Sequence, residues 1–127
     1  MPCCYVIDIE QRLVISTAWD RVSFAEVKAH QDQLASDPDF NPEFNQFVNA
    51  TAVTALDISI EEAKTIAGRR FFAPTAKRAF LASSLPVLGL GRVMEMYAKV
   101  TGKREQVRLF HDRASALQWL GLENVPR

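Results

Sequence analysis

The chain has 127 residues, which favours one compact domain, and 48% of them are hydrophobic while 24% are charged. This composition is typical of an ordinary globular protein and excludes a disordered tail, a collagen-like repeat and a coiled coil. Fifteen basic and fifteen acidic side chains give a net charge of zero, which argues against nucleic-acid binding through bulk positive charge.

The first elements in chain order are predicted to be an antiparallel hairpin and a helix. Residues 5–9 and 13–19 are rich in β-branched and aromatic side chains, with a short polar break between them. Ser23 and Glu26 have the spacing of a capping box, which opens a helix. The helix ends before Pro38, and its inward face carries Phe24, Val27, His30 or Gln31, and Leu34.

The middle of the chain is predicted to contain a loop, a short strand and a second helix. Residues 37–44 hold two prolines and form a loop, and residues 47–48 form a short strand followed by a turn at 49–51. Ser59 and Glu62 form a second capping box. The helix that follows ends at Pro74, and its predicted inward residues are Ile60, Ala63, Ala67 and Phe71.

The last third of the chain adds two strands and two helices. A strand is predicted at residues 78–82, and Pro86 opens a long helix that stops near Gly102. A strand at 107–110 leads to a final helix capped by Asp112. The predicted fold is therefore a single α/β domain over residues 1–127, a mixed sheet flanked by helices in the order β-β-α-β-α-β-α-β-α.

Charge is distributed unevenly along the chain. Residues 1–60 carry three basic and nine acidic side chains, whereas residues 61–104 carry nine basic and three acidic ones. The basic segment predicts a surface that attracts an anion or an acidic partner. The alternative is ordinary solvated surface, with the two charge types interleaved by the fold. The residues expected to form the anion- or partner-binding surface are Arg69, Arg70, Arg78 and Arg92.

The predicted helix at 86–101 has more apolar residues than one packing stripe requires. The excess indicates either an interface or an apolar ligand pocket, since methionine adapts to many partners. A helix wedged between neighbouring helices would have the same pattern. An interface would make the protein a homodimer. The residues expected to line this pocket or interface are Leu88, Met94, Met96 and Tyr97.

No catalytic residue, metal site or cofactor is predicted. The only histidines are His30 and His111, and the carboxylate beside His111 is expected to be occupied as a helix cap. Cys3 and Cys4 are adjacent, a spacing unsuited to chelation or to a mutual disulfide. No apolar run reaches the roughly 18 residues that span a bilayer. Without a signal-peptide pattern at the N-terminus, we expect a cytoplasmic protein that does not span a membrane.

Four segments resemble the STAS superfamily, specifically its SpoIIAA-like branch of small stand-alone bacterial proteins. They are residues 37–44 (DPDFNPEF), 53–59 (VTALDIS), 88–97 (LGLGRVMEMY) and 116–120 (ALQWL). The resemblance covers nearly the whole chain. It implies a mixed sheet with helices on its faces, related in outline to Sec14-like lipid-carrier domains.

The resemblance also identifies a position that acts as a switch in the regulatory members of the superfamily. Those members have an Asp-Ser pair at the start of the second helix, and the serine is phosphorylated to change partner binding. Here Asp57 matches the aspartate, Ile58 stands at the serine position, and Ser59 follows one place later as the predicted cap. The sequence therefore predicts that Ser59 caps the helix and is not a phosphorylation site.

Taken together, these features predict a non-enzymatic binding or regulatory domain of the STAS-like type, whose partner is another protein or a second copy of itself. The alternative is a carrier or sensor of a small apolar or amphipathic, lipid-like ligand. A large apolar cavity would favour the carrier, whereas a filled core with an exposed apolar helix face would favour the protein-binding module.

Overall fold

A computed structural model of the chain describes residues 3–69, 72–73, 75–84, 88–89, 92, 95–96 and 106–122. Within these residues, five strands form one sheet in which each strand lies beside its neighbour in sequence. The first two strands are antiparallel, and all other neighbours are parallel. The predicted mixed sheet is confirmed. The strands are β1 (Cys3–Asp8), β2 (Leu13–Ser23), β3 (Asn45–Asp57), β4 (Lys77–Leu81) and β5 (Gln106–Phe110).

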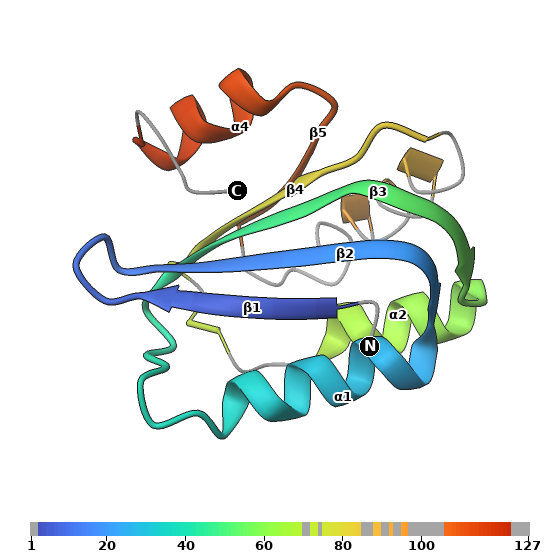
Figure 1. Cartoon of the computed structure of the whole chain (residues 1–127), viewed down its shortest axis with the longest axis horizontal. Coiled ribbons are helices and arrows are strands. Elements are labelled where there is room, and N and C mark those ends of the chain that lie inside the picture. Colours follow the sequence, from blue (N-terminus) through green and yellow to red (C-terminus); the bar gives the residue numbers. More distant parts are fainter. Residues whose placement is uncertain are drawn as a thin grey trace.

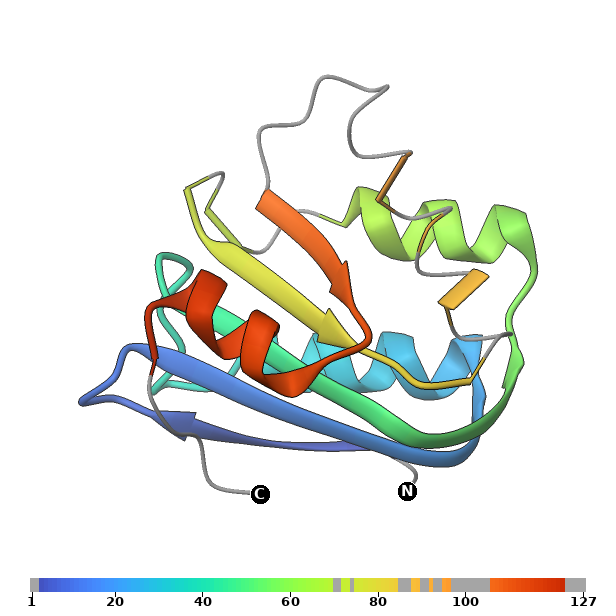
Figure 2. The same cartoon turned by 90° about the horizontal axis from the view of Figure 1, so that it is seen from above.

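Helices cover both faces of the sheet, as Figures 1 and 2 show. The helices α1 (Phe24–Ala35) and α2 (Ile60–Gly68) lie together on one face, and α4 (Arg113–Leu120) lies on the other. Of the helix predicted at 86–101, the described residues 88, 89, 92, 95 and 96 have helical backbone, and the rest lie outside the described residues. None of the described helices combines the length and apolar character needed to cross a bilayer.

The alternation of side chains along the strands separates the core into two layers. On the α4 side, Leu13, Ile15 and Phe47 pack with the apolar residues of that helix. On the α1 side, Val14 packs with Leu34 of the helix. The layer on the α1 and α2 side contains the candidate site.

Each of the three helices begins at the residue that the sequence predicts. Ser23 and Ser59 each accept a hydrogen bond from the backbone N–H three residues later, and the glutamate at that position bonds back to the cap. Asp112 accepts from the backbone N–H of Ser115. These caps satisfy backbone donors that a helix N-terminus otherwise leaves without partners.

The prediction of a short strand and a turn near residue 49 is wrong, because β3 runs for 13 residues. The side chain of Asn49 bonds to the backbone N–H and hydroxyl of Thr51, but the chain does not reverse there. Pairing with β2 continues through two register shifts. At each shift, β3 contains one residue more than the segment of β2 that it pairs with. Such bulges break the alternation on which strand prediction relies.

The predicted inward face of α2 is only partly correct. Ala63 is buried, as predicted, but Ile60 is 57% exposed. Ile60 is the first residue of the helix, where a side chain has fewer neighbours than in the middle of the packed face, and Ile66 is buried instead. The side chain of Ala67, together with Phe71 and Pro74, lies outside the described residues.

Candidate functional site

A cavity of about 140 Å³ lies between the sheet and the helices α1 and α2. Its wall is overwhelmingly apolar. The sheet contributes residues from β2 and β3, and α1 and α2 contribute the opposite side. Lining residues include Ala18, Val22, Val48, Ala50, Val53 and Leu56 from the strands, and Val27, Leu34 and Ile66 from the helices.

The bulges in β3 bring apolar side chains to this wall. Val48, before the first register shift, and Ala50, within it, line the cavity, and Val53 and Leu56 do so after it. A regular strand alternates faces at every residue, so even-numbered residues alone would reach this face. One extra residue turns the odd-numbered Val53 inward, and a second returns the even-numbered Leu56 to the same wall. The backbone irregularity therefore shapes the cavity.

One part of the wall is polar and is built from three neighbouring strands. Ser16 of β2, Gln46 of β3 and Arg78 of β4 are all buried and all line the cavity. Gln46 Nε2 donates to Ser16 Oγ at 3.0 Å, and Arg78 Nε donates to Gln46 Oε1 at 3.0 Å. Gln46 and Arg78 are also register partners. We call these three residues the polar row.

The guanidinium of Arg78 lies among aromatic rings. Its central carbon is 4.5 Å from the centre of the Phe72 ring and 5.7 Å from that of Phe80. Cation–π attraction is strongest where water is excluded, and Arg78 is only 6% exposed. The aromatic contacts and the bond to Gln46 together fix a positive charge at the cavity wall.

The helix α1 extends the polar part of the wall from the opposite side. His30 Nε2 lies 3.2 Å from Ser16 Oγ, and the edge of the Tyr5 ring faces the imidazole with ring centres 5.5 Å apart. Burial lowers the pKa of His30 below its ordinary value. Because burial disfavours the charged form, the imidazole is neutral near pH 7. The Tyr5 hydroxyl donates to Asp37 at 2.7 Å, and burial together with this bond raises the Tyr5 pKa to about 12.

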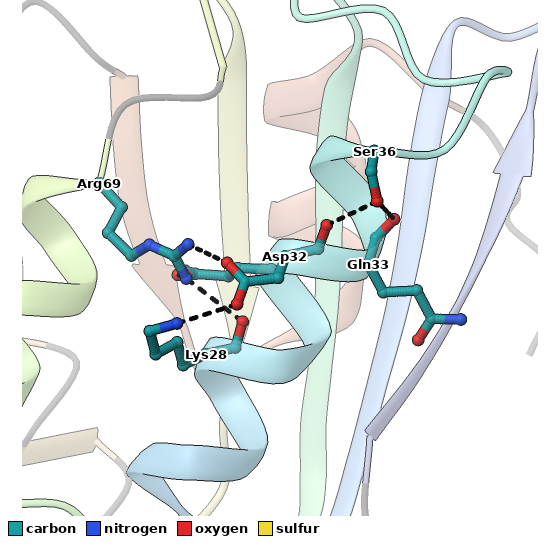
Figure 3. Close-up of polar contacts among 6 residues, drawn as sticks. Lys28, Asp32, Gln33, Ser36 and Arg69 are labelled. Atoms are coloured by element: carbon teal, nitrogen blue, oxygen red, sulfur yellow. Dashed lines mark hydrogen bonds and ion pairs between the residues drawn. The ribbon is translucent and has the colours of Figure 1, made fainter.

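Arg69, the C-cap of α2, joins that helix to α1, as Figure 3 shows. Its guanidinium donates to the Asp32 carboxylate, to the Lys28 carbonyl at 3.2 Å and to Gln31 Oε1 at 3.1 Å. Lys28 also pairs with Asp32 at 3.0 Å. The hydrogen bonds from Arg69 and Lys28 lower the pKa of Asp32. This polar link holds the two helices beside each other over the cavity.

The four arginines expected to bind an anion or a partner have different surroundings. Arg69 bonds to α1, Arg78 is buried in the polar row, and Arg92 is exposed. Arg70 lies outside the described residues. The burial of Arg78 removes it from any solvent-facing patch, while a common anion-attracting surface of the other three stays a prediction.

The residues expected to form an apolar pocket or interface are described in part. Leu88 packs against Val22, Val53 and Ala82, each of which lines the cavity. Met96 is 63% exposed. Met94 and Tyr97 lie outside the described residues. Leu88 thus adjoins the cavity wall and Met96 faces solvent, while a pocket or an interface built from these residues stays a prediction.

Sequence reasoning missed the polar row. The available signal was a polar residue inside or directly before an apolar run: Ser16 after residues 13–15, Gln46 before 47–48, and Arg78 before 79–82. Buried polar groups need hydrogen-bond partners, but the partners lie about 30 residues apart along the chain. Only the strand register brings them together.

Metal binding has no structural support among the described residues, which contain no group of three or more histidine, cysteine and acidic side chains arranged to hold an ion. Cys3 lines the cavity, and burial, followed by the nearby charge of Glu26, raises the pKa of its thiol. The thiol is therefore protonated at neutral pH, which makes it a poor nucleophile.

Comparison with solved structures identifies the architecture. An uncharacterised protein of the DUF3478 family from Shewanella loihica PV-4, described as having a SpoIIAA-like fold, superposes with a TM-score of 0.59. The match covers 93% of each chain at 16% sequence identity. The fold is SpoIIAA-like. This result confirms the predicted fold, and at such low identity the likeness extends to the fold alone. No family model and no curated protein matches the sequence.

Proposed function

We propose that this SpoIIAA-like domain is a non-catalytic binding module whose ligand is a small, mostly apolar molecule held between the sheet and the helices α1 and α2. The observation that carries the proposal is the apolar cavity of about 140 Å³ with its polar row. Well-packed cores contain few voids larger than a water molecule. A larger apolar space therefore supports a site that can hold a small ligand.

The cavity volume limits the size of the ligand. An apolar cavity of about 150 Å³ holds one benzene molecule, whereas drug-sized ligands occupy sites of roughly 300–1,000 Å³. The space of about 140 Å³ therefore matches a compact molecule or the end of a longer one. A complete two-chain lipid is too large for it.

The chemistry of the wall supports binding over catalysis. The contact between Ser16 and His30 resembles the start of a nucleophile–base pair. A working pair also needs a third group to orient the imidazole, and no carboxylate lines the described part of the wall. Ser16 Oγ instead accepts a bond from Gln46. Hydrolysis of p-nitrophenyl acetate that disappears in Ser16→Ala would contradict the non-catalytic part of the proposal.

Toluene is a suitable probe for the cavity because it is apolar and close to benzene in size. We expect saturable changes in the backbone amide spectrum at Ala18, Ala50 and Val53, with little change in α4 on the opposite face. Native mass spectrometry of protein purified from its own host tests for a retained natural ligand. Toluene binding that leaves the cavity residues unchanged would overturn the proposal.

We propose as a second candidate function self-association through a surface that includes Met96, which is 63% exposed. A two-fold interface would bury the same patch of each copy, at roughly 800 Å² per partner. Sedimentation equilibrium at micromolar concentration tests this directly. A dimer that becomes monomeric in Met96→Glu while keeping its circular dichroism supports it, and a single 14.3 kDa species in the unaltered protein contradicts it.

A further inference from the structure

We infer that the ligand of the cavity carries a carbonyl-type oxygen, which accepts hydrogen bonds from His30 and Gln31 of α1 while its apolar body occupies the rest of the space. This inference rests on the proposed function, because it assigns a chemical class to the ligand of the same cavity. It depends on three observations: both side chains are buried at the cavity wall, their bonds within the chain determine which of their atoms are donors, and no described residue accepts from those donors.

The amide of Gln31 has a defined orientation. Gln31 lines the cavity and is 6% exposed, and Arg69 Nη1 donates to its Oε1 at 3.1 Å. Because an arginine side chain only donates, this bond identifies the amide oxygen and places the –NH2 group on the other branch of the amide. No described residue accepts a hydrogen bond from Gln31 Nε2. A buried amide at the cavity wall therefore keeps a donor that the described chain does not use.

A second donor follows from the bonds of Ser16. Arg78 Nε donates to Gln46 Oε1, so Nε2 is the atom of the Gln46 amide that donates to Ser16 Oγ. The other bond of Ser16 Oγ is to His30 Nε2 at 3.2 Å, and this is where its hydroxyl hydrogen finds an acceptor among the described residues. A neutral imidazole that accepts at Nε2 carries its hydrogen on Nδ1. His30 lines the cavity, is 9% exposed, and has no described acceptor for Nδ1.

Two buried donors without an acceptor in the described chain indicate what the ligand supplies. Buried polar groups are paired in the great majority of cases, because an unpaired group loses its hydration without replacement. A carbonyl oxygen has two lone pairs and can accept two hydrogen bonds. With its oxygen toward His30 and Gln31, the ligand places its apolar body against the sheet, where Val48 and Ala50 line the cavity.

Ordered water is the alternative acceptor for the two donors. Buried waters commonly bond to polar groups that the chain leaves unpaired. If water filled this role permanently, the donors would not be available to a ligand, and a ligand carbonyl would lose its own hydration without gaining a partner. The comparison of two ligands of the same shape, one with a carbonyl and one without, separates these two cases.

The experiment compares cyclopentanone with methylenecyclopentane, which share one ring and differ in a C=O against a C=CH2 group. Affinities are measured by calorimetry at pH 7.5, and amide spectra locate the binding site. Burial of a carbonyl without a hydrogen bond weakens binding by roughly 30-fold, the equivalent of about 2 kcal/mol. With the donors available, we expect cyclopentanone to bind within about tenfold of methylenecyclopentane. A ketone that binds more weakly than this limit overturns the inference.

Isosteric variants test which donor is responsible. Gln31→Glu keeps an oxygen for Arg69 and replaces the –NH2 donor with a second oxygen, and Gln31→Met removes the donor without adding charge. Each should weaken cyclopentanone by at least about fivefold and leave methylenecyclopentane within about threefold of its original affinity. Gln33→Glu is the matched control, since Gln33 is exposed on the same helix and does not line the cavity. The comparison on the unaltered protein needs no variant, so it stands even if a Gln31 variant does not fold.

Nitrogen spectra of the His30 imidazole give a readout that does not depend on affinity. We expect the hydrogen on Nδ1 in the ligand-free protein, and we expect this resonance to shift with cyclopentanone more than with methylenecyclopentane. A hydrogen on Nε2 would show that His30 does not offer the second donor and would overturn the inference.

The failure of the inference differs from the failure of the proposed function. A ketone affinity that stays within tenfold of the hydrocarbon, and that falls in Gln31→Glu but not in Gln33→Glu, supports the inference. If methylenecyclopentane binds in the cavity but the two glutamine variants respond alike, the inference is overturned and the proposed function is intact. If neither molecule nor toluene affects the cavity residues, the proposed function is overturned as well.

Discussion

Filling the cavity tests the central feature of the site without changing its charge. Ala50 of β3 lines the cavity, and Ala50→Leu adds three carbon atoms there. Each buried methylene contributes about 0.8 kcal/mol, so the substitution can stabilise the protein by about 2 kcal/mol. The whole cavity of 140 Å³ sets a ceiling of about 3 kcal/mol, using about 24 cal/mol per Å³. The expected gain lies below this ceiling.

The informative result is whether Ala50→Leu stabilises or destabilises the protein. In a well-packed core, the same added atoms would force neighbours apart and destabilise the protein by about 1–3 kcal/mol. The assay is urea unfolding with linear extrapolation. For a slope of roughly 1–3 kcal/mol per molar urea, a gain of about 2 kcal/mol raises the midpoint by about 1 M. The leucine should also compete with toluene for the same space and weaken its binding at least tenfold.

Ala52→Leu provides the matched control, because Ala52 is exposed on the same strand and does not line the cavity. It should leave stability within about 0.5 kcal/mol of the original value and leave toluene binding unchanged. If Ala50→Leu destabilised the protein by more than 1 kcal/mol and toluene still bound, the reasoning from the cavity would be refuted.

Three further predictions concern the helices. Ser59→Ala should lower the free energy of unfolding by about 1 kcal/mol through loss of the cap, measured in urea, while phosphopeptide analysis of cellular protein should find Ser59 unmodified. Because the pKa of buried His30 is lowered on folding, the unfolded chain binds more protons below about pH 6.5. Stability in urea should therefore fall as the pH drops below that value, and His30→Gln should flatten this pH dependence. Arg69→Met should accelerate amide hydrogen exchange in α2 and leave β2 and β3 unchanged, since it removes the link to α1.

Local interactions explain which parts of the fold could be predicted from the sequence. The caps at Ser23, Ser59 and Asp112 join residues only three positions apart, so the spacing in the sequence contains the whole interaction. The length of β3 depends instead on β2, which pairs with it from more than 25 residues away. The two extra residues of β3 disrupt its alternation, and nothing in the local sequence records the partner that keeps it extended.

The site was harder to predict than the fold for the same reason. Ser16, Gln46 and Arg78 each lie within or directly beside an apolar run, and nothing in the neighbouring sequence indicates the partner that each one bonds to. Arg78 was grouped with other arginines because residues 61–104 are basic, yet the strand buries its side chain. The sequence shows that Arg78 is charged, but it does not show which way its side chain points. That direction depends on which face of β4 meets the cavity.

The two register shifts between β2 and β3 also affect how this protein can change during evolution. Each extra residue of β3 reverses the face of every residue that follows it in the strand. Inserting one residue between Ala55 and Leu56, for example, would turn Leu56 away from the wall that it lines. Substitutions of lining residues can alter ligand preference one side chain at a time. A single-residue insertion in β3 would instead rebuild the end of the cavity at once, so insertions are expected to concentrate elsewhere, such as the turn at residues 9–12.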